Sequence, residues 1–166
     1  MQARTVTAVS AALAATILSI YLAIASMANR ADEAELDDGV VRVRSVYPFP
    51  ETVERLKRDV ASKGIMIFSE IDQAKLATDA GIALRPSTLL VFGNPALGVQ
   101  FITAKAQAGL DWPVRLLVHE DASGQVWTAY TDFHWIARRH HIRDREQAFK
   151  MASSVIASIT ASVAAK

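Results

Sequence analysis

The stretch from Leu84 to Pro95, with the sequence LRPSTLLVFGNP, constrains the fold more than any other part of the chain. Its four consecutive apolar residues, 89–92, lie between two prolines and predict a strand that is buried on both faces. Asn94 is a favourable N-cap residue, and Pro95 then takes the first helical position, where proline is favourable. The stretch therefore predicts a central strand that turns directly into a helix.

The remainder of the chain alternates between strand-like and helix-like patterns. Two strand-like runs are separated only by Asp121-Ala122-Ser123-Gly124, which is typical of a β-hairpin, so part of the sheet must be antiparallel. We therefore predict an α+β fold, a single mixed or antiparallel sheet with helices packed on it, in the order β-α-β-α-β-α-β-β-α-α. The other strands are predicted at 40–47, 65–72, 114–120 and 125–130, and the helices at 50–64, 73–80 and 95–107, with a brief one capped by Asp132 and a long one from Asp144.

Two of these helices have a clear apolar face. Val53, Leu56 and Val60 recur at helical spacing, and Gly64 is a favourable end for the helix that contains them. In the last helix, Gln147 follows Asp144 at the spacing of a capping box. Its apolar stripe comprises Phe149, Ala152, either Val155 or Ile156, Ile159 and Val163.

The N-terminal stretch predicts export. Residues 5–27 contain no charge, Arg4 precedes them, and Ser26-Met27-Ala28 fits a signal-peptidase site with cleavage after Ala28. The alternative is an uncleaved membrane anchor, because the uncharged stretch is long enough to span a bilayer. Under either interpretation residues 1–28 are a leader or anchor, 29–39 a disordered tether, and 40–166 a single domain outside the cytoplasm, in the periplasm or cell envelope.

Composition excludes several classes of site and partner. The chain has no cysteine, so disulfides, zinc–thiolate sites and cysteine nucleophiles are ruled out. Without residues 1–28 it has 17 basic and 17 acidic residues, and such a balanced charge gives no electrostatic case for binding nucleic acid. No cofactor is predicted.

A series of short motifs follows in a fixed order along the chain. They are Phe68-Ser69-Glu70-Ile71-Asp72, Leu84-Arg85-Pro86, Leu89 to Pro95, Leu110 to Arg115, Glu120-Asp121, Gly124, Val126-Trp127, Tyr130 and Asp132. With these motifs the chain resembles the bacterial domain-of-unknown-function 302 family over roughly residues 41–161. The likeness implies a compact α+β domain that self-associates as a homodimer, and it implies no established activity. The sequence departs from the family where Gln73 follows Asp72, since relatives often have histidine there.

Few residues are candidates for chemistry. His119 precedes Glu120 and Asp121 at a strand end, where it could serve as a general acid or base, and His140 is a second candidate for that role. No metal site is predicted, because the spacing of the histidines does not suit a shared metal ion. Gly93 and Asn94 are candidate ligand-binding residues, because amides at a helix N-terminus can bind an anion.

These features favour an exported, dimeric domain that binds a small ligand or a partner in the cell envelope. The first alternative is an enzyme, hydrolase-like or of another kind, that uses His119 or His140 with Glu120 or Asp121. The second is a purely structural envelope protein.

Overall fold

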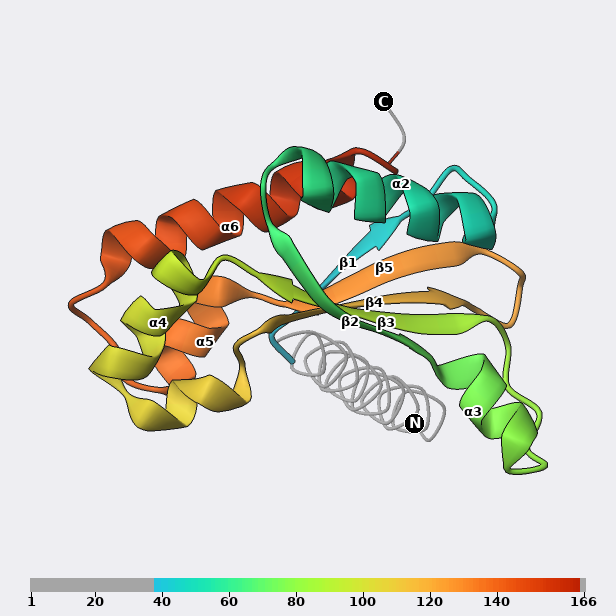
Figure 1. The fold of residues 1–166 in the computed structure, drawn as a ribbon, viewed down its shortest axis with the longest axis horizontal. Helices are drawn as coiled ribbons and strands as arrows, with labels where there is room; N and C mark the ends of the chain where they lie inside the picture. Colours follow the sequence, from blue (N-terminus) through green and yellow to red (C-terminus); the bar gives the residue numbers. More distant parts are fainter. Residues whose placement is uncertain (1–37, 165–166) are drawn as a thin grey trace, which may run out of the picture. The chain divides into compact units, whose positions relative to one another are not determined.

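The computed structural model describes residues 38–164. Five strands form one fully antiparallel sheet in the order β1-β5-β4-β3-β2, and helices pack on it, so the predicted α+β class and element order are confirmed (Figure 1). The elements are β1 (Val40–Arg44), α2 (Phe49–Ser62), β2 (Met66–Asp72), α3 (Gln73–Asp79), β3 (Ser87–Gly93), α4 (Pro95–Ala104), the 3₁₀-helix η1 (Ala106–Leu110), β4 (Val114–Glu120), β5 (Val126–Thr131), α5 (Phe133–Arg139) and α6 (Glu146–Ala161).

The two faces of the sheet differ in what covers them. Helices α2 and α6 lie over the same face (Figure 1). On β3, Leu90 and Phe92 point to that face and are 0% and 2% exposed, whereas Leu89 and Val91 point the other way and are only half-buried. The prediction that this strand is buried on both faces is therefore wrong, because an antiparallel sheet needs helices on one face only. β4, not β3, is the middle strand.

The core lies between the sheet and the two long helices. Val53, Leu56 and Val60 of α2 are buried as their spacing predicts. From α6, Phe149 stacks on Phe101 of α4 with ring centroids 4.3 Å apart. These contacts fix the position of α4 beside α6, and the candidate site lies between these two helices.

Two local predictions need correction, and one alternative that the sequence left open is decided. The last helix begins at Glu146, not Asp144, and no side chain caps it, because Asp144 pairs with Arg145 instead. Its buried stripe uses Ile156, which is 2% exposed, while Val155 is half-buried. The helix expected over 95–107 ends at Ala104, and η1 follows it.

The strand over 66–72 is also more exposed than its apolar start predicts. β2 is the edge of the sheet, and Met66 and Phe68 are 55% and 41% exposed. The predicted leader at 1–28, and residues 29–37 of the predicted tether, lie outside the described residues. Within residues 38–164, no helix is long and apolar enough to cross a membrane.

Candidate functional site

The turn from β3 into α4 has the predicted cap. Asn94 Oδ1 accepts a hydrogen bond from Ala96 N at 2.9 Å, and Pro95 takes the first helical position. The next two amides, of Leu97 and Gly98, donate to the Asn94 carbonyl at 3.1 and 2.9 Å. Proline has no N–H group, so the amides at 96–98 that were candidates for binding an anion are already engaged within the turn.

The indole of Trp112 packs against this turn because two glycines leave room for it. A Cβ atom on Gly98 would lie 1.9 Å from Trp112 Cε2 and Nε1, and one on Gly93 would lie 3.0 Å from Trp112 Nε1. The first distance is impossible without movement of the ring. Gly93 and Gly98 are therefore needed for the close approach of Trp112 to α4 and to the end of β3.

A cleft of about 390 Å³ opens between α6, the start of α4 and Trp112. Its inner wall is apolar and includes the buried rings of Phe92, Phe101 and Phe133, while Met151, 58% exposed, lies among its outer residues. The predicted ligand-binding residues Gly93 and Asn94 both line it. The remaining lining residues are Lys63, Ile65, Leu97, Trp112, Val114, Ala152, Ser154, Val155, Ile156 and Ser158.

Polar groups of the cleft are few. Lys63 Nζ lies 2.6 Å from Asp59 Oδ2, so its charge is partly neutralised. The indole N–H of Trp112 donates no hydrogen bond to residues 38–164, and this atom is not sealed from solvent. The cleft thus combines aromatic and aliphatic walls with a few polar groups, among them the indole N–H of Trp112, which is a composition typical of small-molecule pockets.

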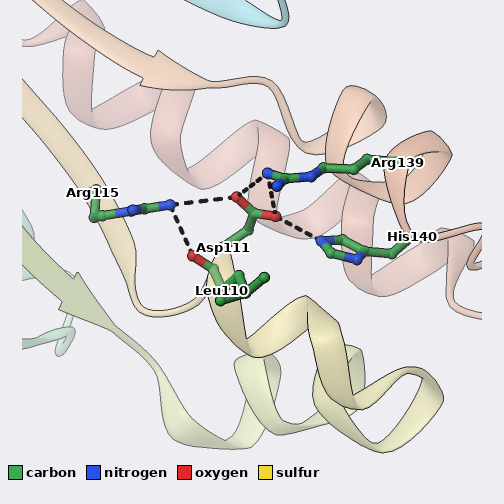
Figure 2. Close-up of polar contacts among 5 residues, drawn as sticks. All are labelled: Leu110, Asp111, Arg115, Arg139 and His140. Atoms are coloured by element: carbon green, nitrogen blue, oxygen red, sulfur yellow. Dashed lines mark hydrogen bonds and ion pairs between the residues drawn. The ribbon is translucent and has the colours of Figure 1, made fainter.

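The residue before Trp112 is the buried centre of a charge cluster (Figure 2). Asp111 has a side chain only 3% exposed, and its carboxylate lies between Arg115 on one side and Arg139 and His140 on the other. His140 Nε2 is 2.6 Å from Asp111 Oδ2, and Arg139 Nη1 lies 3.1 and 3.2 Å from the two oxygens. Arg115 also donates to the carbonyl of Leu110 at 2.8 Å.

We call Asp111, Arg115, Arg139 and His140 the Asp111 cluster. It joins the turn before β4 and the start of β4 to the end of α5, so two segments far apart in the sequence hold the backbone next to Trp112. Its four side chains are engaged with one another, and the adjoining space beside Asp111, about 10 Å³, is too small for more than a water molecule. The cluster is therefore suited to positioning Trp112, and His140 is one of its members.

The candidate acid–base residues do not come together. His119 lies at the other end of β4 from Asp111, on the sheet face away from α2 and α6, opposite Trp127 of β5 and Ser87 of β3. Glu120 instead pairs with Arg85 at 3.2 Å. His119 and His140 thus belong to separate regions, and His140 has Asp111 as its carboxylate partner in place of Glu120 or Asp121.

Asp121 organises the hairpin turn. Its carboxylate accepts hydrogen bonds from Ser123 Oγ at 2.6 Å and from Trp127 Nε1 at 2.8 Å. These bonds, the one from Ser123 first, hold the pKa of Asp121 well below its usual range. A carboxylate kept ionised and already saturated by donors is a structural acceptor, not a general acid at neutral pH.

Gln73, where relatives often have histidine, lies at the same end of the sheet as His119. Its Oε1 accepts a hydrogen bond of 2.7 Å from Ser87 Oγ, and Ser87 is the register partner of His119. Residues 73, 87 and 119 are thus neighbours across three elements. Among residues 38–164, no three histidine, aspartate or glutamate side chains gather where they could hold a metal ion.

Comparison with known proteins identifies the family. Residues 41–159 match the family described as "Domain of unknown function DUF302". The chain belongs to the DUF302 family. A crystal structure of an uncharacterised DUF302 protein from Bacillus stearothermophilus has the same fold, with a TM-score of 0.69 over 76% of this chain and 98% of that one; the two are 14% identical.

Three relatives carry a functional name, and all three are named as fluoride-specific ion channels. Two of them are "Fluoride-specific ion channel FluC 1" of Brucella suis and of Brucella abortus, each 39% identical to this DUF302 chain over 107 residues. The match covers 64% of this chain but only 42% and 40% of those proteins. This chain thus spans about two fifths of the length of these relatives, and most of each named channel lies outside the match.

Proposed function

We propose that this DUF302 domain binds a small, largely apolar molecule in the cleft beside Trp112. The observation that carries the proposal is the cleft itself, whose volume of about 390 Å³ falls in the range of small-molecule pockets. Buried phenylalanines provide its inner surface, and the free indole N–H of Trp112 offers one donor to a hydrogen-bond acceptor on the ligand.

The Asp111 cluster supports this proposal because it makes the cleft wall rigid before any ligand arrives. Trp112 follows Asp111 directly, and its ring is confined by Gly93 and Gly98. A wall that does not have to be ordered on binding costs less conformational entropy, so more of the contact energy appears as affinity.

We propose that the domain acts outside the cytoplasm as a homodimer. The uncharged stretch at 5–27 supports export. The relatives named as fluoride-specific ion channels carry a matching domain within a longer chain, which supports a role at the cell envelope. Recovery of the protein from the bacterium and determination of its first residue test this: Asn29 indicates cleavage, whereas Met1 indicates that the leader is retained as an anchor.

A thermal-shift screen tests the ligand proposal. Benzoate, octanoate and their neutral methyl esters are added separately to the full chain, and a ligand at about 100 times its dissociation constant should stabilise the fold by about 2.7 kcal/mol, a rise of several degrees. Equal stabilisation by an acid and its methyl ester would indicate that the apolar walls of the cleft provide the binding energy. A preference for the acid favours an anion near Lys63 or Asn94.

Two tryptophan substitutions separate the cleft from other surfaces. Val155→Trp fills the cleft from α6 and should abolish the shift, whereas Val99→Trp, on the exposed surface of α4, should preserve it. If no compound stabilises the protein, the alternative of a purely structural envelope protein is favoured over ligand binding. If both variants respond like the wild type, ligand binds elsewhere.

A further inference from the structure

The segment between β2 and β3, which contains α3, exposes large aliphatic side chains. Leu76, Ile82 and Leu84 are 59%, 63% and 52% exposed, and we call them the α3 patch. No residue of α3 is buried. Figure 1 shows α3 beyond the ends of the strands, apart from α2, α4, α5 and α6. Within residues 38–164, these three side chains are therefore left largely open to solvent, at a free energy cost that association would remove.

A glycine turn ends α3 and directly precedes Ile82. Gly81, with φ of 73°, donates to Thr78 O at 2.9 Å, and Ile82 N donates to Ala77 O at 2.8 Å. These two bonds define a Schellman motif, in which the residue after the glycine packs against the side chain of the last helical turns. Ile82 occupies that position after the helix, and Leu84 follows two residues later in the same loop.

We propose that the α3 patch is the surface through which two copies of this chain associate about a two-fold axis. Lys75 and Asp79 flank residue 77 at equal distances along α3 and form an ion pair of 2.7 Å. When two such helices pack antiparallel about residue 77, Lys75 meets the partner's Asp79, and Asp79 meets the partner's Lys75. The surface is thus complementary to itself in charge as well as apolar, which a two-fold contact requires.

This inference rests on the proposed homodimer and names its contact. Three aliphatic side chains from each copy form a small interface, so the dimer should dissociate on dilution rather than be permanent. The contact does not include the cleft beside Trp112, because no residue of the α3 patch lines that cleft. Ligand binding and association can therefore be tested separately.

Sedimentation velocity of the full chain over a concentration series tests the α3 patch. Leu76→Glu and Ile82→Glu should each raise the dissociation constant at least about tenfold, the loss expected when one buried aliphatic contact is replaced by a charge. The matched control is Val99→Glu on α4, where the side chain is 46% exposed and the constant should not change. Every variant keeps residues 1–37, so any association through that part is common to all.

Charge variants distinguish the two-fold contact from the ion pair within each helix. Lys75→Asp gives a helix with two acids, and Asp79→Lys gives one with two lysines, so each variant alone should be monomeric. An equimolar mixture should associate, because each acidic helix then faces a basic one, although neither chain regains its internal pair. A mixture no more associated than its components would overturn the antiparallel contact.

The remaining outcomes are also decisive. If the wild type is a monomer at all concentrations, both the homodimer and the α3 patch are refuted. If it associates and Leu76→Glu leaves that association intact, the homodimer stands and the patch is refuted. Neither result bears on the ligand proposal, which is judged by the thermal shift alone.

Discussion

Replacing Gly98 by alanine sets two opposing effects against each other. Gly98 lies inside α4, where alanine is intrinsically more stable than glycine by about 1 kcal/mol. The added methyl group, however, would lie 1.9 Å from Trp112 Cε2, whereas ordinary contacts between carbon atoms are about 3.5–4.0 Å. The indole must move outward by roughly 1.5 Å or more, a distance that follows from those two spacings.

The clash should be the larger effect. Overpacking of this kind costs about 1–3 kcal/mol, and the displaced ring also loses contacts with Gly93 and Phe68, to which it is packed at a centroid distance of 6.0 Å. An approach of 1.9 Å belongs to the upper half of that range, about 2–3 kcal/mol, and subtracting about 1 kcal/mol for helix propensity leaves a net destabilisation of roughly 1–2 kcal/mol. Gly98→Ala should therefore destabilise the protein and weaken ligand binding in the cleft.

Urea denaturation, followed by far-UV circular dichroism, gives the free energy of unfolding for a double-mutant cycle with Trp112→Ala. Once the indole is removed, Gly98→Ala should change sign and stabilise α4 by about 1 kcal/mol. Gly109→Ala is the control, because a Cβ there would lie 3.9 Å from Ile102 Cδ1, an ordinary contact. If Gly98→Ala is neutral or stabilising in the wild type, or the two substitutions are additive, Trp112 does not pack as described.

Three further predictions follow from the same region and from the hairpin. Asp111→Ala should lower the free energy of unfolding, measured by urea denaturation, by about 2–3 kcal/mol, mainly because the buried pair with His140 is lost; the two arginines are half-exposed and contribute less. The control Asp144→Ala removes an exposed ion pair and should lower it by less than about 0.5 kcal/mol. Asn94→Ala should cost about 1 kcal/mol by loss of the cap of α4, and Asn94→Ser should restore most of it; equal losses in both would contradict the capping role. The pKa of Asp121 is lower in the folded protein than its ordinary value of 3.8, so its ionised carboxylate stabilises the fold above pH 3.8 and this stabilisation is lost as the pH falls below that value. The difference in free energy of unfolding between wild type and Asp121→Ala should therefore shrink below pH 3.8. A difference that does not depend on pH would contradict this role of Asp121.

The fold was predictable where a pattern is local. Periodicity located α2 with its buried Val53, Leu56 and Val60, and the hairpin between β4 and β5 follows from its turn residues. The start of α6 was mispredicted because Asp144 fits a capping box, yet in the structure Asp144 pairs with its neighbour Arg145. The exposure of β2 was missed because an edge position depends on strand order, which no local pattern encodes.

The candidate site was predictable only in part. Gly93 and Asn94 were identified from the turn they form, and both line the cleft. Asp111 was missed, because its partners Arg139 and His140 lie more than 25 residues away and only the folded sheet brings them together. One signal was present: an aspartate next to a Trp-Pro pair, in a motif shared with the family, is an unusual residue to bury and requires a cationic partner.

The role of the Asp111 cluster is tested more directly by the affinity of the cleft for a ligand than by the stability of the fold. Asp111 does not line the cleft, so its removal takes no contact from a ligand. Removal of Asp111 does free the backbone beside Trp112, so the indole ring would then have to become ordered when the ligand binds. A cluster that serves only the fold predicts unchanged affinity in the fraction that remains folded. If the folded Asp111→Ala protein instead binds ligand more weakly, and the loss exceeds that caused by Asn94→Ala at a residue that does line the cleft, the buried carboxylate pre-organises the wall.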